Sequence, residues 1–133
     1  SEMCIRDRGM SEALSKLIEA VATGQAPTGL DVHRADTGHS DHITMVLGAF
    51  NGSLDAAKEL HDALLPGWRF KIEQHEIVAH GDDFTACVWP NDYSRREQVF
   101  RPSGEAPTAA RAWLLAILNA LDAQRAHDAG RRA

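Results

Sequence analysis

The sequence predicts an α+β fold in which an antiparallel β-meander of about three to four strands packs with helices, in the order α-α-β-β-β-α. Before residue 65 and after residue 107, apolar residues recur at helical spacing. Between these regions, apolar and polar residues alternate with the period of two that strands require. Because the chain has 133 residues, we expect a single domain.

The two ends of the chain are expected to lie outside this domain. Ser1 looks like the scar of a removed tag, and residues 2–9 are similar to translated adapter sequence, which makes Met10 the natural start. Residues 1–9 are therefore predicted to be a disordered leader, residues 10–126 the single α+β domain, and residues 127–133 a disordered tail.

A first helix is predicted over residues 11–22. Ser11 can cap its free amides, and Gly24 and Pro27 end it. Its apolar stripe consists of Leu14, Leu17, Ile18 and Val21. The polar residues 29–42 predict a long loop, and residues 43–47 a short strand.

The second helix has clear start and stop signals. Ser53 is its predicted cap, Asp55 lies favourably in the first turn, and Pro66-Gly67 ends it. The side chains expected to face inward are Leu54, Ala57, Leu60, His61 and Leu64.

A meander of strands should follow. Apolar Trp68, Phe70 and Ile72 alternate with polar residues, and a similar alternation covers residues 84–89 until Pro90. Residues 81–83 are the predicted turn between these strands, and residues 98–101 the predicted third strand.

The last helix, predicted over residues 108–125, is apolar over most of its circumference. Leu115 and Leu118 fall inside its polar stripe, which implies a second covering layer. A neighbouring subunit is the simplest source of that layer, so we predict a homo-oligomer with both leucines in its interface. A segment of the same chain is the alternative.

Three local motifs resemble the phage ABA sandwich domain family. They are Leu-Asp-Ala-Ala at residues 54–57, Pro-Gly-Trp at residues 66–68, and an alanine-rich last helix entered through Pro107 and Thr108. The resemblance covers residues 10–125 and implies a phage or prophage protein. It also implies a three-layer sandwich with helices on both faces of the sheet. The His- and Asp-rich loop before the second helix goes beyond the family pattern.

Charge and composition exclude several classes of function. A net charge of −5 argues against extensive binding to a nucleic-acid backbone. No apolar run approaches the roughly 20 residues that a membrane span needs, and no secretory signal precedes Met10. Outside the leader, Cys87 is alone, so no disulfide is expected. We therefore expect a cytoplasmic protein of an infected bacterial host.

The loop over residues 31–42 is a weak candidate for metal binding. His39 and His42 have the separation found on one side of a finger-type zinc site, but no cysteine pair complements them. A solvated polar loop is the alternative. No motif for a catalytic nucleophile, a phosphate loop or a dinucleotide is present, so neither a catalytic residue nor a cofactor is predicted.

The sheet offers a better candidate site, which would bind a small anion such as a nucleotide. Arginine forks match phosphate oxygens, and aromatic rings stack on bases. An ordinary charged solvent face is the alternative. The predicted ligand-binding residues are Arg69, Lys71, Thr85, Trp89, Tyr93, Arg95, Arg96 and Arg101.

These observations predict a non-enzymatic phage protein that binds a small ligand. It would be a sponge that sequesters nucleotide immune signals, of the cyclic oligonucleotide or cyclic ADP-ribose type, and so blocks host anti-phage defence. Three alternatives remain open. The first is docking on a protein through the last helix, and the second is an enzyme that degrades a nucleotide through the loop over residues 33–42. The third is a double-stranded RNA-binding domain, which would require a basic final helix.

Overall fold

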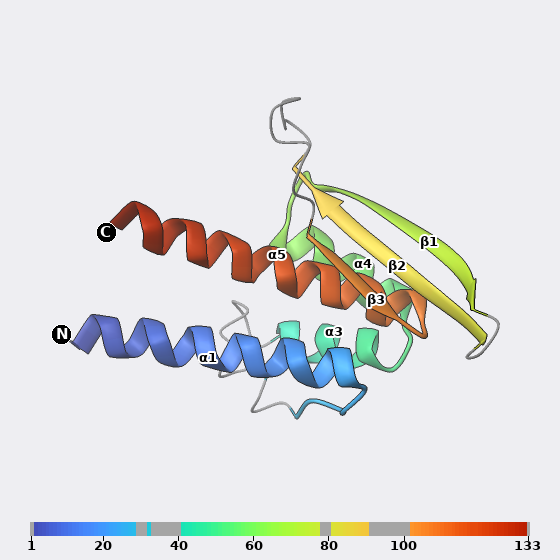
Figure 1. The fold of residues 1–133 in the computed structure, drawn as a ribbon, viewed down its shortest axis with the longest axis horizontal. Helices are drawn as coiled ribbons and strands as arrows, with labels where there is room; N and C mark the ends of the chain where they lie inside the picture. Colours follow the sequence, from blue (N-terminus) through green and yellow to red (C-terminus); the bar gives the residue numbers. More distant parts are fainter. Residues whose placement is uncertain (1, 29–31, 33–40, 78–80, 91–101, 133) are drawn as a thin grey trace.

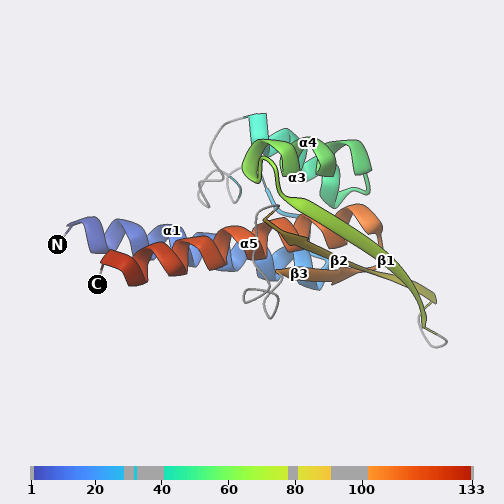
Figure 2. The same ribbon diagram turned by 90° about the horizontal axis from the view of Figure 1, so that it is seen from above.

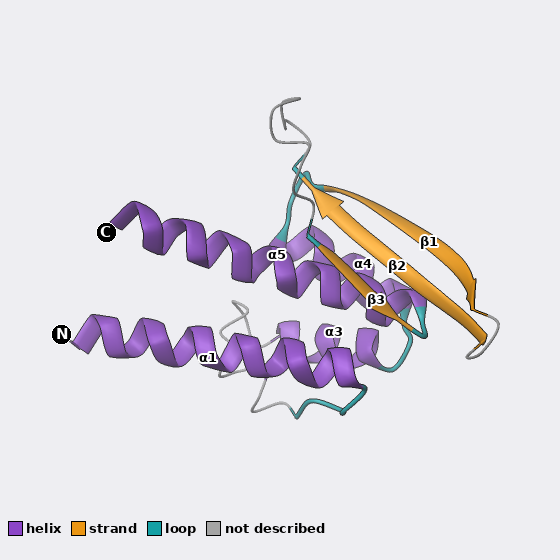
Figure 3. Cartoon of the chain, viewed as in Figure 1, coloured by secondary structure: helices purple, strands orange, loops and turns teal. Residues whose placement is uncertain are grey.

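A computed structural model of the chain describes residues 2–28, 32, 41–77, 81–90 and 102–132. Four helices and a three-stranded antiparallel sheet make up this part of the chain and confirm the α+β fold (Figures 1 and 3). In chain order the elements are α1 (Glu2–Thr23), α3 (Asp41–Phe50), α4 (Leu54–Leu64), β1 (Arg69–Ile77), β2 (Gly81–Trp89), β3 (Ser103–Ala106) and α5 (Ala109–Arg132).

Helices α1 and α5 are both longer than the sequence predicted. Helix α1 begins at Glu2, in the predicted disordered leader, and α5 continues to Arg132, in the predicted disordered tail. Neither extension contains a proline, and adding residues to an existing helix costs far less than starting one. The interpretation of Ser1 as the scar of a removed tag and of residues 2–9 as translated adapter sequence stays a prediction.

Residues 43–47 form part of helix α3, so the short strand predicted there is wrong. The β-branched residues in this segment favour a strand locally, but Ile43, Val46 and Phe50 recur at helical spacing, and Val46 and Phe50 are buried. Gly48 lets α3 approach α4 closely, because a Cβ atom there would lie 3.0 Å from the Cβ atom of Ala56. Tertiary packing therefore outweighs the local strand preference.

Helix α4 begins and ends as the sequence predicted. Ser53 is the N-cap, and its side-chain oxygen accepts a hydrogen bond of 3.2 Å from the backbone N–H of Ala56. The helix ends before Pro66-Gly67, where Gly67 has φ of 80°. Of the five residues predicted to face inward, Ala57, Leu60 and His61 are buried and Leu64 is half-buried. Leu54 is 49% exposed, so its inward placement was wrong.

Replacing Ser53 by alanine should lower the free energy of unfolding by about 1 kcal/mol, because a helix amide loses its capping acceptor. Urea denaturation would measure this change. The matched control is Lys58→Ala, which removes an exposed ion pair to Asp62 on the same helix and should cost less than about 0.5 kcal/mol. Equal losses in the two variants would show that the cap contributes no more than a surface contact.

The sheet has the strand order β1-β2-β3, and both pairings are antiparallel. Strand β2 begins at Gly81, so the turn predicted at residues 81–83 lies inside a strand. The predicted third strand at residues 98–101 lies outside the described residues. The structure has β3 at Ser103–Ala106, a segment whose composition gave no strand signal. Its pairing with β2 and its burial against α5 specify it.

Helix α5 lies at the centre of the molecule, between the sheet and the other helices (Figures 1 and 2). Leu115 is 6% exposed and Leu118 is fully buried within one chain, so neither forms the predicted subunit interface. The reason is that the polar stripe of α5 also contacts its own chain, where Asn119 donates a hydrogen bond of 2.7 Å to the backbone oxygen of Ser103. The second covering layer is therefore intramolecular.

All described helices that pack on the sheet lie against one of its faces. On this inner face, Gly104 of β3 approaches α5 so closely that an added Cβ atom would lie 2.6 Å from the backbone oxygen of Ala112. On the opposite face, the side chains of Arg69, Glu73 and Glu105 are exposed. Within the described residues, the helix layer on the second face that the family resemblance implied is not found.

Candidate functional site

The strand register gathers part of the predicted ligand-binding cluster on the face of the sheet that the described helices leave uncovered. Arg69 lies opposite Trp89, Lys71 opposite Cys87, and Glu73 opposite Thr85. Directly opposed residues of an antiparallel pair point to the same side of the sheet. We call this side the outer face; its described side chains are Arg69, Lys71, Glu73, Asp83, Thr85, Cys87, Trp89, Ser103 and Glu105.

Half of the predicted cluster can be placed in this way. Arg69, Lys71, Thr85 and Trp89 share the outer face, as the alternation of residues predicted. The other members lie outside the described residues: Tyr93, Arg95, Arg96 and Arg101.

The outer face also carries acidic residues that the sequence analysis did not include. The Lys71 Nζ atom lies 2.5 Å from Glu73 Oε1, in an ion pair whose side chains are 58% and 46% exposed. Glu73 of β1 and Glu105 of β3 lie on the two sides of Thr85. The two basic side chains of the described outer face are therefore outnumbered by three acidic ones, Glu73, Asp83 and Glu105, and its basic character is confined to the end with Arg69 and Lys71.

Arg69 and Trp89 form the part of the outer face that suits an anionic ligand best. They are directly opposed in the register, the Arg69 side chain is exposed, and Trp89 is half-buried. A guanidinium group can bind a phosphate or carboxylate through two parallel hydrogen bonds, and an indole ring can stack on a flat base. Thr85 lies four residues along β2 from Trp89, next to Glu73 and Glu105, and so belongs to the acidic end.

Only one of the two weak candidates for a metal ligand lies in the described part of the chain. His42 lies in the first turn of α3 and already has an interaction within the chain, while His39 lies outside the described residues. The residues that the structure describes contain no group of three histidine, cysteine or carboxylate side chains able to hold a metal ion.

His61 is a structural residue, as its position on the apolar side of α4 predicted. Its side chain is 2% exposed. The Trp113 Nε1–H group donates a 3.2 Å hydrogen bond to His61 Nδ1, and an indole nitrogen can only donate. His61 Nε2 therefore carries the proton and donates to the backbone oxygen of Trp68 at 2.9 Å. Both ring nitrogens are used in joining α4, α5 and the segment leading into β1.

The ring of His61 is also part of an aromatic cluster on the inner face. Phe70 stacks on Trp113 with ring centroids 4.1 Å apart, and the His61 ring meets Phe70 edge-on at 5.4 Å. Trp113 is 3% exposed and belongs to the core. Phe70 is 40% exposed, because it lies on the edge strand of the sheet.

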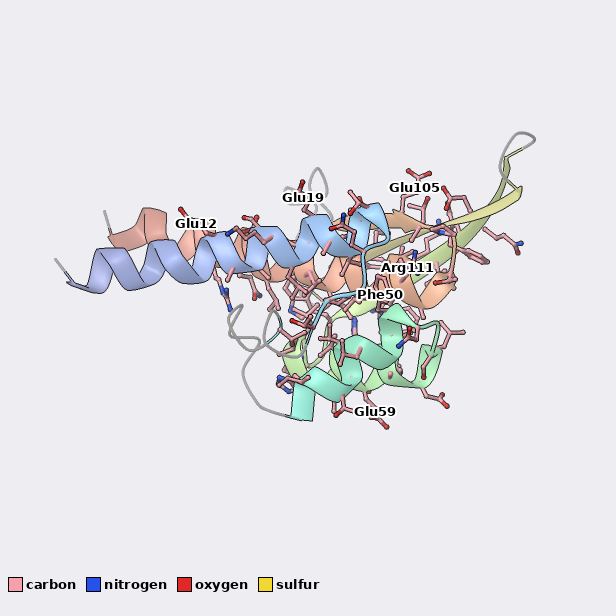
Figure 4. All side chains as sticks on the ribbon, turned by 90° about the horizontal axis from the view of Figure 1, so that it is seen from below. Glu12, Glu19, Phe50, Glu59, Glu105 and Arg111 are labelled. Atoms are coloured by element: carbon pink, nitrogen blue, oxygen red, sulfur yellow. The ribbon has the colours of Figure 1, made fainter. Side chains whose placement is uncertain are left out.

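Arg111 is a partly buried cation whose position the sequence did not predict. Its guanidinium carbon lies 4.3 Å from the centroid of the Phe50 ring, and Figure 4 shows the two side chains together in the interior. Its Nε atom is buried without a hydrogen-bond partner in the described part of the chain. Its Nη1 atom lies close to Gly24. Arg111 thus lies near the carboxyl ends of α1 and α3, where helix dipoles favour a cation.

No protein-family model, no curated protein and no solved structure gives a significant match to this chain. The resemblance to the phage ABA sandwich family therefore stays a prediction based on its three local motifs. In the part of the chain that the structure describes, no helix is both long enough and apolar enough to span a bilayer.

Proposed function

We propose that the protein binds a small anionic ligand with a flat aromatic part, such as a nucleotide, on the outer face of its sheet and does not transform it. The observation that supports this proposal is the direct opposition of Arg69 and Trp89 at the basic end of that face. There, Arg69 would bind the phosphate with help from Lys71, and Trp89 would stack on the base.

The distribution of charge favours one orientation of the ligand. Glu73 and Glu105 occupy the other end of the described outer face and would repel a phosphate. The anionic group is therefore expected at Arg69, and Thr85 is expected to have no part in binding it. Tyr93, Arg95, Arg96 and Arg101 follow β2 in the chain and stay proposed members of the site.

The biological role is proposed from the family resemblance. If the chain is a phage protein, stoichiometric capture of a cyclic oligonucleotide or a cyclic ADP-ribose variant in the host cytoplasm would block signalling in anti-phage defence. Binding alone would suffice for this role, so no catalytic residue and no cofactor is needed.

The rival functions differ in how well the structure accommodates them. Docking on a partner through Leu115 and Leu118 is contradicted by the burial of both side chains. An enzyme built on the loop over residues 33–42 stays the alternative hypothesis, because residues 33–40 lie outside the described part of the chain.

Calorimetric titration with cyclic dinucleotides, cyclic trinucleotides and cyclised ADP-ribose isomers should reveal micromolar or tighter binding to one of them. Replacing Trp89 by alanine should weaken this binding by about 5- to 150-fold, because a stacked base loses roughly 1–3 kcal/mol. Arg69→Ala should weaken it to a similar degree, since a charge-assisted hydrogen bond contributes about 1.5–3 kcal/mol.

Lys58→Ala is the matched control, because it removes an exposed positive charge on α4 and should leave the affinity unchanged. Recovery of intact ligand from the denatured complex distinguishes capture from degradation. Absence of heat with every compound would contradict the proposed function, while unchanged affinity in the Arg69 and Trp89 variants would contradict the proposed site.

A further inference from the structure

Strand β1 gives the sheet a long edge that no described element pairs with. It is the terminal strand of the order β1-β2-β3 and forms the outer margin of the sheet in Figure 1. Its residues from Arg69 to Ile77 pair with β2 without a bulge, and it contains no proline. Such a regular edge can accept another strand. The opposite edge strand, β3, spans only Ser103–Ala106.

The hydrogen bonds of the sheet show which backbone groups point out of this edge. The Val88 amide donates to the Pro102 oxygen, so the backbone N–H and C=O groups of Val88 point toward β3. Those of its neighbour Cys87 point toward β1. Lys71 lies opposite Cys87, so the backbone N–H and C=O groups of Lys71 point toward β2. By the same alternation, the N–H and C=O groups of Phe70, Ile72 and Gln74 point out of the free edge.

Among the possible registers of two antiparallel β1 strands, one pairs opposite charges without placing two described like charges face to face. The two-fold axis must pass midway between the two copies of one residue, so that outward-pointing backbone groups of the two copies meet; we call this an axis at that residue. An axis at residue 71 places Arg69 opposite Glu73 but also Lys71 opposite Lys71, and an axis at residue 73 places Glu73 opposite Glu73. Only an axis at Ile72 places Lys71 of each copy opposite Glu73 of the other.

We propose that two copies of this chain form a dimer by antiparallel pairing of their β1 strands about a two-fold axis at Ile72. The two sheets then continue into one, with the order β3-β2-β1-β1-β2-β3. Two symmetric Lys71–Glu73 contacts between the copies add to the ion pair that these residues form within each chain. This interface replaces the one expected at Leu115 and Leu118, and it does not rest on the proposed ligand.

The inner face supplies an apolar contribution to the same interface. Phe70 is 40% exposed although its ring stacks on Trp113 in the core. In the proposed register, Phe70 lies opposite Gln74 of the partner subunit, and the half-buried Ile72 lies opposite its own copy. Pairing therefore covers apolar surface that a single chain leaves in water.

Sedimentation equilibrium of the full chain, over a series of concentrations, tests this dimer. The unaltered protein should sediment as a dimer. Lys71→Glu alone and Glu73→Lys alone should each raise the dimer dissociation constant by about tenfold or more, because like charges then face each other twice. An equimolar mixture of these two variants should form a heterodimer, because every facing pair is then attractive.

The double variant Lys71→Glu/Glu73→Lys should dimerise like the unaltered protein, since it exchanges both charges together. Lys58→Glu reverses an exposed charge on α4 and should not affect the dimer. Circular dichroism of each variant checks that the fold is intact. A monomer at millimolar chain concentration would overturn the proposal. So would a dimer whose dissociation constant is unchanged by Lys71→Glu.

Discussion

Replacement of Gly104 by alanine is expected to lower the free energy of unfolding by about 3 kcal/mol. An added Cβ atom would lie 2.6 Å from the backbone oxygen of Ala112, 2.6 Å from the Cβ atom of Leu115 and 2.7 Å from the backbone nitrogen of Ala116. Real Cβ contacts are not this short, and backbone atoms cannot move aside as a flexible side chain can. Strand β3 and helix α5 must therefore separate.

Urea denaturation monitored by circular dichroism would measure this loss. An equal dependence of the unfolding free energy on urea concentration in the variant and the unaltered protein would exclude a change in the unfolded state. The matched control is Glu105→Ala, which alters the next residue of β3 on the exposed outer face and should change the stability by less than about 0.5 kcal/mol. A Gly104→Ala protein as stable as this control would mean that β3 does not pack against α5 as described.

His61→Phe is expected to cost about 2–4 kcal/mol, although it keeps an aromatic ring next to Phe70 and Trp113. Phenylalanine can neither accept the hydrogen bond from Trp113 Nε1 nor donate one to the Trp68 oxygen. Both groups then lose their partner, and a buried polar group left without one costs about 1–3 kcal/mol.

Two amide variants separate these contributions and are measured by the same denaturation experiment. In His61→Asn, the side-chain oxygen can replace Nδ1 as acceptor for Trp113. In His61→Gln, the amide nitrogen can replace Nε2 as donor to the Trp68 oxygen. The bond to Trp113 is buried and the other is only partly buried, so asparagine should retain more stability than glutamine. A phenylalanine variant more stable than both would show that the hydrogen bonds contribute little.

The elements that the sequence predicted well are those specified by local signals. The N-cap at Ser53 and the turn at Pro66-Gly67 bound α4, and the alternation after Trp68 defines β1 and its faces. Because this alternation has a period of two, it also determined that Arg69, Lys71, Thr85 and Trp89 share one side of the sheet.

The elements that the sequence mispredicted depend on contacts between distant segments. The β-branched residues of α3 favour a strand until burial of Val46 and the close approach at Gly48 are taken into account. Strand β3 has no local signal, because the close approach of α5 requires glycine at residue 104, and glycine has a low strand propensity. The charge of the candidate site also depends on contacts between strands. The pairing of Lys71 with Glu73 and the position of Glu105 reduce the positive charge of a cluster that seemed uniformly basic in the sequence.

By itself, the sequence determined the class of fold, most of the elements and which strand residues share a face, because these follow from periodicity and capping along the chain. Tertiary structure alone decided what covers the last helix, where Arg111 lies and which strands form the edges of the described sheet. A helical pattern shows that Leu115 and Leu118 need a covering layer, but it cannot identify that layer. Only packing in three dimensions places α5 between the sheet and the other helices and puts β1 at an edge of the sheet with which no described element pairs.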